Sequence, residues 1–195
     1  MGYRIVTGPA AEPVTRAEAK LWLRVEDYGS PAAHPDDALI DALIEAARQY
    51  VERYVNAAIV DQTVEVAYDS FAPEMLLPFG GATSITSVKY QDADDAEQTA
   101  SSALYIFDSH SSPKRVVLAY GQSWPDALAE RNAVKVTYQA GDNSSPQDVD
   151  ERIKTAIKLL VADYYENREA KIVGVSVAVN QAVGALLYPL RELGL

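Results

Sequence analysis

Carboxylates gather at one place in this sequence of 195 residues, and they are the first groups that could do chemistry. The cluster consists of Asp92, Asp94, Asp95 and Glu97. Closely spaced carboxylates are the ligands that Ca²⁺ and Mg²⁺ prefer. A twelve-residue calcium loop also needs a central glycine and a terminal glutamate that binds through both oxygens, and this run continues into Gln98 without either. The pattern is typical of a solvated hairpin tip, so we predict no metal site.

Nucleophilic catalysis has few candidate residues. The chain has no cysteine and only two histidines, His34 and His110, so thiolate chemistry is excluded and imidazole chemistry rests on two side chains. Ser109 and Ser111 flank His110, but neighbours in sequence rarely face one reacting centre, and no nucleophile-elbow pattern is present. The glycine pair 80–81 lacks the lysine and the helix that follow a phosphate-binding loop. We predict that the protein is not an enzyme, has no catalytic residues and binds no cofactor.

Charge is distributed unevenly along the chain, which carries 28 acidic and 17 basic side chains, a net charge of −11. Residues 1–60 hold nine acidic and six basic side chains (−3), residues 61–150 fourteen and five (−9), and residues 151–195 five and six (+1). A chain this acidic does not bind phosphate backbones over a broad surface, because its negative charge repels the negatively charged phosphates.

The sequence also lacks membrane and export signals. No apolar run approaches the roughly 18 residues of a membrane span, and the first ten residues lack a signal peptide's apolar region. We expect a soluble protein of a reducing compartment.

Helical periodicity predicts helices on both sides of the acidic middle segment. The sequence Thr15-Arg16-Ala17-Glu18 fits a capping box at a helix start. Apolar residues recur at spacings of three and four over 39–55 and again from 149 to about 170. A short last helix is predicted from about Gln181, and Pro189 limits it.

The middle segment changes to a period of two, which is typical of strands. The β-rich runs are 63–68, 84–90, 104–107, 115–120 and 133–138. The intervals between them are too short for helical crossovers, so the strands are expected to be antiparallel.

Together these periods predict an α+β fold. It consists of a helical bundle (two N-terminal helices, a long C-terminal helix and a short last helix) with an inserted antiparallel β-sheet or small β-sandwich. The expected regions are an N-terminal helical part over 1–60, a β segment over 61–147, and C-terminal helices with an arm over 148–195 that pack with 1–60.

The stretch 172–179 alternates valine with small residues and contains no charge and no proline. Such a composition aggregates when it is exposed, so we expect a cover for it. Two covers stay open: burial within its own domain, or burial against a neighbouring subunit as an arm or an augmenting strand. The candidate subunit-interface residues are Ile172, Val173, Val175, Val177 and Val179.

The order of motifs along nearly the whole chain resembles the head–tail connector (adaptor, or head-completion) proteins of long-tailed bacteriophages and phage-like particles. Each motif is short, and their succession carries the resemblance. The matching stretches are 15–20, 23–25, 36–40, 46–48, 77–78, 85–90, 116–118, Gly121, 124–125, 134–141, 153–157, 165–169 and 186–191.

The resemblance implies a structural protein of the virion. Members assemble as rings, commonly of twelve copies, beneath the portal through which DNA passes without sequence-specific binding. One face of the ring docks on the portal and the other receives the tail or a stopper, with no membrane involved. The implied location is the head–tail junction, after synthesis in the cytoplasm of the bacterial host. Because the C-terminal part often contacts the portal, the resemblance assigns portal binding to Leu187, Tyr188, Leu190, Arg191 and Leu193.

Two other functions stay open from the sequence. One is a metal- or carbohydrate-binding module, or a hydrolase, built on the β segment. The other is an acidic protein that imitates DNA and inhibits a nucleic-acid enzyme, which would bind a basic partner and be released by moderate salt.

Overall fold

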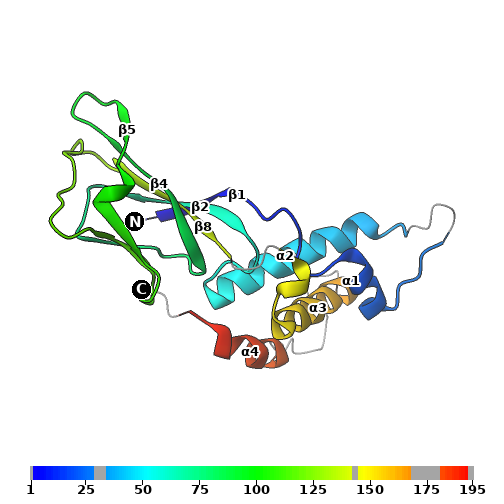
Figure 1. Ribbon diagram of the computed structural model, residues 1–195. Coiled ribbons are helices and arrows are strands. Elements are labelled where there is room, and N and C mark those ends of the chain that lie inside the picture. The colour runs from blue at the N-terminus through cyan, green and yellow to red at the C-terminus, as the bar shows by residue number, and fades with distance from the viewer. Residues whose placement is uncertain (1, 29–33, 142–144, 168–180, 193–195) are drawn as a thin grey trace, which may run out of the picture. The chain divides into compact units, whose positions relative to one another are not determined.

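The computed structural model describes residues 2–28, 34–141, 145–167 and 181–192, and it shows an α+β fold (Figure 1). The chain divides into two compact units, each assembled from separate stretches of sequence. The β unit comprises 1–10, 56–144 and 192–195, and the helical unit comprises 11–55 and 145–191. No helix in the described part of the chain is long and apolar enough to cross a membrane.

The β unit is built on a five-stranded antiparallel sheet with β8 at its centre. In spatial order the strands are β1 (Gly2–Thr7), β2 (Gln62–Tyr68), β8 (Val134–Ala140), β4 (Ala82–Gln91) and β5 (Glu97–Thr99). Alternate residues of β8 are fully buried, namely Val134, Val136, Tyr138 and Ala140. Successive side chains of a strand point to opposite faces, so this alternation turns one face of the sheet towards the core.

A second antiparallel sheet completes the β unit. Its strands, in spatial order, are β3 (Glu74–Leu76), β7 (Arg115–Leu118) and β6 (Tyr105–Asp108). Met75 and Val116 of this sheet share one apolar core with Val64, Val66 and Val88 of the larger sheet. Two sheets around one core form a small β-sandwich, which is one of the two arrangements that the sequence left open.

The helical unit contains four α-helices: α1 (Arg16–Leu23), α2 (Asp37–Val55), α3 (Glu151–Glu166) and α4 (Gln181–Leu187). Helices α2 and α3 lie side by side, α1 contacts both, and α4 packs on both α3 and α2 (Figure 1). The apolar stripes of α2 and α3 are buried. An amphipathic helix of this length is marginal by itself, so the mutual burial of these stripes stabilises the unit. Short 3₁₀ turns lie at η1 (Ser102–Leu104), η2 (Pro146–Asp148) and η3 (Tyr188–Leu190).

Most predicted elements are confirmed. The five predicted strands correspond to β2, β6, β7, β8 and the longer β4. Helix α1 begins with the predicted capping box: the backbone N–H of Glu18 donates to Thr15 Oγ1 over 3.2 Å, and the backbone N–H of Thr15 donates to Glu18 Oε2 over 2.7 Å.

Three details differ from the expectations. Residues 2–7, which fall in the N-terminal region expected to be helical, form β1, because pairing with β2 satisfies the backbone groups on the side that faces β2. Helix α3 ends at Glu166 and not near residue 170, since the backbone of Asn167 leaves the helical region with φ −108° and ψ 69°. The strands β3 and β5 have only three residues each, which is too short for a period of two to stand out.

Gly141 ends β8 at a close approach of two backbone segments. Its φ is +94°, and a Cβ at this position would lie 2.4 Å from the carbonyl carbon of Val60. Its N–H donates to the carbonyl of Gly81 over 2.9 Å. Glycine is therefore required at position 141 both for its φ and for the space.

Replacing Gly141 by alanine is expected to lower the free energy of unfolding by about 3 kcal/mol or more, because strain at positive φ adds to a clash with backbone. Gly121→Ala is the matched control: Gly121 also has a positive φ, +74°, but nothing lies within 4 Å of its Cβ position. We expect the control to cost about 1 kcal/mol. Urea denaturation of the full chain measures both, and equal losses would contradict the role of the close approach.

Candidate functional site: the C-terminal surface of the helical unit

The acidic cluster is the tip of the hairpin between β4 and β5. Asp92 Oδ1 accepts hydrogen bonds from two backbone amides of the turn, both over 3.0 Å, and its Oδ2 accepts one from Gln98 Nε2 over 2.8 Å. These bonds, that from the Ala96 amide first, lower the pKa of Asp92. Glu97 accepts a bond from Lys89 Nζ over 2.7 Å. Among the described residues no three His, Asp or Glu side chains are grouped to hold a metal ion; Asp92 folds the turn and Glu97 pairs across it.

Asp108 organises the turn that contains His110 and its flanking serines. Its carboxylate accepts bonds from Ser111 Oγ over 2.6 Å and from Arg115 Nε over 2.9 Å, and also from the backbone amides of His110 and Ser111. These bonds, that from the Ser111 hydroxyl first, hold the pKa of Asp108 well below its usual range. The Ser111 hydroxyl thus donates to a carboxylate and not to an imidazole. This bond stabilises the turn, and it is not the serine–histidine contact of a nucleophilic site.

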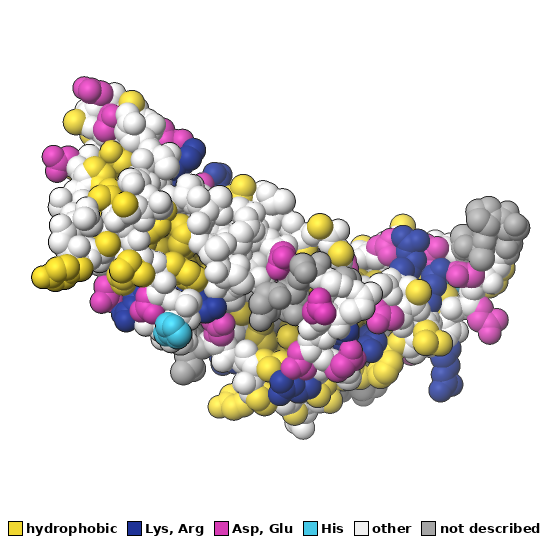
Figure 2. Space-filling model, viewed as in Figure 1, with side chains coloured by type: hydrophobic (Ala, Val, Ile, Leu, Met, Phe, Trp, Pro, Cys, Tyr) yellow, Lys and Arg dark blue, Asp and Glu magenta, His cyan; other side chains and the backbone are white. Residues whose placement is uncertain are grey.

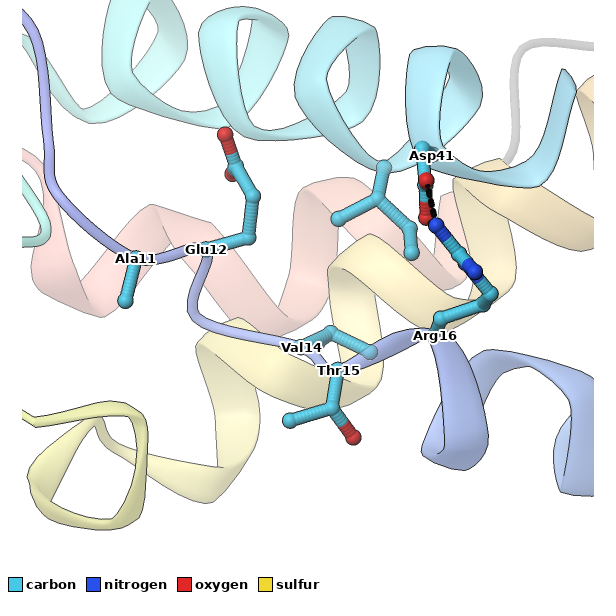
Figure 3. Close-up of a pocket in the computed structure, with 7 residues that line it drawn as sticks. Ala11, Glu12, Val14, Thr15, Arg16 and Asp41 are labelled. Atoms are coloured by element: carbon cyan, nitrogen blue, oxygen red, sulfur yellow. Dashed lines mark hydrogen bonds and ion pairs between the residues drawn. The ribbon is translucent and has the colours of Figure 1, made fainter. Parts of the chain in front are cut away.

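A pocket of the helical unit, with a volume of about 190 Å³, gathers charged and apolar side chains. It is lined by Ala11, Glu12, Val14, Thr15, Arg16, Asp41 and Ile44 (Figure 3). Arg16 Nε donates to Asp41 Oδ1 over 2.7 Å, and this bond raises the pKa of Arg16. Glu12 accepts from Arg48 Nε over 2.8 Å. The pair with Glu12 ties the segment before α1 to α2, and the pair with Arg16 ties the first residue of α1 to α2, which is a structural use of the charges.

Arg48 lies in the middle of α2 and is only 4% exposed. Besides Glu12, it pairs over 2.8 Å with Glu52, one turn further along α2 and 3% exposed. Burial alone would lower the pKa of Arg48, but the hydrogen bond with Glu12 and the charge of Glu52 outweigh it and raise that pKa. A buried cation is tolerated only with such partners, so this network ties together the two sequence-distant stretches that carry Glu12 and Arg48.

Lys20 has a similar role for α1. It is 7% exposed and forms ion pairs with Asp27, beyond the end of α1, and with Asp37 in the first turn of α2. The bond with Asp27 raises the pKa of Lys20, and the bond with Lys20 lowers the pKa of Asp37. The two ion pairs therefore fix the position of α1 against the start of α2.

The chain leaves α4 through a short exposed stretch. Val183 and Leu187 are buried, at 3% and 0% exposure, so they hold α4 on the unit. In η3 and just after it, Tyr188 is 71% exposed, Leu190 is half-buried and Arg191 is exposed. We call Tyr188, Leu190 and Arg191 the C-terminal surface.

The structure thus separates the residues that the sequence assigned to portal binding. It brings Tyr188, Leu190 and Arg191 together at the surface and places Leu187 in the core. Leu193 lies outside the described residues. So do all the candidate subunit-interface residues, Ile172, Val173, Val175, Val177 and Val179.

Sequence reasoning missed several apolar side chains that lie at the surface. On α1, Leu21 is 82% and Trp22 is 45% exposed, and the ammonium of Lys158 lies 5.5 Å from the centre of the Trp22 ring. Figure 2 shows apolar side chains among interspersed acidic and basic ones on the visible face of the helical unit. Apolar periodicity could not identify these residues, because it marks apolar positions without showing which of them a partner element covers.

The carboxylates of Asp92, Glu97 and Asp108 all serve turns or ion pairs within the fold. This use is typical of a structural protein. The chain belongs to the head completion protein family, whose model matches residues 23–181. It is accordingly a structural head–tail adaptor of a virion and not an enzyme, so the hydrolase considered above is not its function. No protein with a curated function matches the sequence significantly.

Solved structures share the fold over the whole chain. A chain from the neck of an empty gene transfer agent particle, computed with C6 symmetry, is similar with a TM-score of 0.80. Chains from the virion of a native gene transfer agent and from a native neck computed with C12 symmetry have TM-scores of 0.79 and 0.77. Each is 22% identical and aligns with 100% of this chain and 97% of its own length.

Removing the buried cation tests the Arg48 network. Arg48→Ala is expected to destabilise the protein by about 3–5 kcal/mol, because it breaks the buried ion pair with Glu52 and the ion pair with Glu12. The double variant Arg48→Met with Glu52→Met is expected to recover most of that loss, since buried ion pairs can be replaced by apolar residues of similar size. Urea denaturation measures both, and a double variant no more stable than Arg48→Ala would contradict this explanation.

The depressed pKa of Asp108 predicts a pH dependence. Its contribution to stability is fully present above the pKa of an unfolded aspartate, about 4, and is lost as the pH falls through the lower folded-state pKa. Asp108→Asn is therefore expected to be less stable than the parent at pH 7, with a difference that shrinks below about pH 4. Urea midpoints measured from pH 7 to pH 2 check this; a constant difference would show that charge is not the cause.

Proposed function

We propose that the chain is the subunit of a ring beneath the portal of a phage or phage-like particle, where it links the DNA-filled head to the tail. The observation that carries the proposal is the family match over 23–181, and the fold shared with chains of particle necks supports it. The symmetries of those necks, C6 and C12, favour a ring of twelve copies. Its partners are the portal protein on one face and a tail or stopper protein on the other. The subunit is made in the host cytoplasm and ends at the head–tail junction.

In a ring of identical subunits, one surface of each copy contacts a different surface of the next copy, and these contacts close into a circle. Twelve simultaneous contacts with the portal add up, so each contact can be weak. We assign the contact between subunits to Ile172, Val173, Val175, Val177 and Val179, since an uncharged β-prone stretch needs a cover.

The charge of the chain suits a DNA channel. The β unit carries 13 acidic and six basic side chains, and the helical unit 15 and 11. An acidic wall repels the phosphate backbone, so DNA slides through the ring without sequence-specific binding. The alternative of a DNA-mimicking inhibitor rests on the same net charge but has no support from the family or the fold.

The C-terminal surface is the region that we assign to portal docking. An exposed tyrosine and an exposed arginine are the residue types that dominate protein interfaces, and Leu190 adds half-buried apolar area beside them. Leu187 supports this surface from the core by holding α4 in place. Leu193, two residues beyond Arg191, belongs to the same proposal.

Point variants test the docking without disturbing the core. Tyr188→Ala combined with Arg191→Glu is expected to weaken binding to purified portal rings at least about tenfold, because interface tyrosine and arginine residues each contribute about 1–2 kcal/mol or more. Tyr120→Ala is the matched control, since Tyr120 is fully exposed and lies in the β unit. Sedimentation with portal rings measures both variants. Equal weakening by the two, or by neither, contradicts the assignment of the C-terminal surface.

Electron microscopy tests the ring itself. The full chain is mixed with portal-bearing capsids that lack the adaptor, because the portal can be needed as a template for the ring. A ring of added density below the portal is the expected result. Capsids that remain unchanged at saturating protein would overturn the proposed function.

A further inference from the structure

Strand β1 forms an open edge of the five-stranded sheet. Among the described residues it pairs with β2 along one side only. Its side chains are exposed except for half-buried Tyr3, and two large apolar ones stand out: Ile5 is 46% and Val6 is 51% exposed. An edge strand presents a row of unpaired N–H and C=O groups, which is a template for another strand.

The two faces of β1 differ in character. Tyr3 lies opposite Val66 and Ile5 opposite Val64, and both valines are fully buried. Residues directly opposite in a sheet point to the same face, so Tyr3 and Ile5 lie on the core face; Tyr3 stacks on Phe79 with 5.1 Å between ring centres. The core therefore continues to the edge strand, where Ile5 is left partly uncovered.

The opposite face of β1 is polar. Arg4 lies opposite Glu65, and its Nε donates to Glu65 Oε1 over 2.9 Å. A strand added beside β1 would therefore meet apolar side chains on one face and an ion pair on the other.

The other sheet edges are less suited to a partner strand. Strands β3 and β5 have three residues each, and all three residues of β5 are polar and exposed. The portion of β4 that β5 leaves open has two register shifts, which twist an edge away from partners. Strand β6 has four residues and ends in Asp108, whose carboxylate is used by the following turn. Among the described residues β1 is the longest edge strand, and its pairing with β2 is regular from Gly2 to Ile5, with one register shift between Ile5 and Thr7.

The stretch 172–179 has the complementary pattern in its sequence, IVGVSVAV. If it is extended, one face carries Val173, Val175, Val177 and Val179. The other face then carries Gly174, Ser176 and Ala178 after Ile172, which leaves room beside the pair of Arg4 and Glu65. The stretch contains no charge that burial would leave unpaired. Eight extended residues span about 26 Å and the six residues of β1 about 20 Å, so the stretch is long enough to cover the whole of β1.

The closure of a ring favours a neighbouring copy as the receiver. The stretch lies between Glu166, the end of α3, and Gln181, the start of α4, in the helical unit, and β1 lies in the β unit. A closed ring needs a donor surface and a different receiver surface on every subunit, and these two stretches supply one of each.

We propose that β1 receives 172–179 of the neighbouring subunit, so that each five-stranded sheet gains a sixth strand from the next copy in the ring. The inference rests on the proposed function, because it requires the ring. It adds to that function the receiving surface, which consists of β1 with Tyr3, Ile5 and Val6.

Cysteine cross-linking tests the contact, and the chain is suited to it because it contains no cysteine of its own. Ile5→Cys and Val175→Cys are made as separate full-length variants with different tags, mixed, and assembled on portal-bearing capsids. A thiol-specific cross-linker is expected to give a product that carries both tags. The matched control replaces Ile5→Cys by Ile106→Cys, whose site on β6 is 54% exposed, and is expected to give at least about tenfold less product.

The outcomes separate the inference from the proposed function. Rings that form without the product joining positions 5 and 175, or with as much of the control product, would overturn the inference and leave the ring intact. The same holds if a single chain carrying both cysteines cross-links internally as a dilute monomer, because the stretch then pairs with its own β1. Capsids without any ring overturn the proposed function and the inference with it.

A charge at the edge gives a second test. Val6→Lys is expected to reduce the occupancy of rings on capsids at least about tenfold, because a lysine on an edge strand opposes strand addition. Ile106→Lys on β6 is the matched control and is expected to assemble within about twofold of the parent. Both side chains are more than half exposed, so both variants should fold, and urea denaturation confirms it. Equal assembly by the two variants contradicts the inference.

Discussion

The pairing of β8 with both of its neighbours is the constraint on which the β unit depends. Tyr138 lies opposite Val64 on β2 and opposite Ile85 on β4, so the register of three strands is fixed together. A slip of one residue would turn the buried side chains of β8 to the other face. The hydroxyl of Tyr138 donates to the carbonyl of Phe79 over 3.0 Å, and burial raises the pKa of Tyr138 far above its usual value.

Ion pairs have a comparable role in the helical unit, whose two stretches, 11–55 and 145–191, are far apart in sequence. Apolar burial brings α2 and α3 together but does not by itself select one arrangement, because it is not directional. Arg48 and Lys20 supply directional contacts within the first stretch, each with two carboxylates. Between the two stretches, the hydroxyl of Tyr165 on α3 donates to Asp36 Oδ2 over 2.7 Å. The acidic excess of the chain therefore has a structural use inside this unit, apart from any effect on passing DNA.

Sequence periodicity predicted the elements that bury one face and missed those that do not. Helix α2 and strand β8 have regular apolar spacing over 19 and seven residues, and both were found. Strand β1 has little burial, and its apolar residues Ile5 and Val6 are neighbours in sequence, so no period of two marked it. At the C-terminal surface the sequence could not show that Leu187 faces inward while Tyr188 faces outward. That difference depends on how α4 packs on α2 and α3, which is a contact between residues distant in sequence.

The divided helical unit also has a consequence for how the protein is made. Helix α2 is complete at Val55, but α3, which covers it, begins at Glu151. At a translation speed of about 5–20 residues per second, that interval lasts roughly 5–20 seconds. Strands β1 to β8 leave the ribosome before α3 does, so the sandwich can fold first and the helices last. The stretch around Tyr188 follows α4, so it gains its support only after α2, α3 and α4 have all been made.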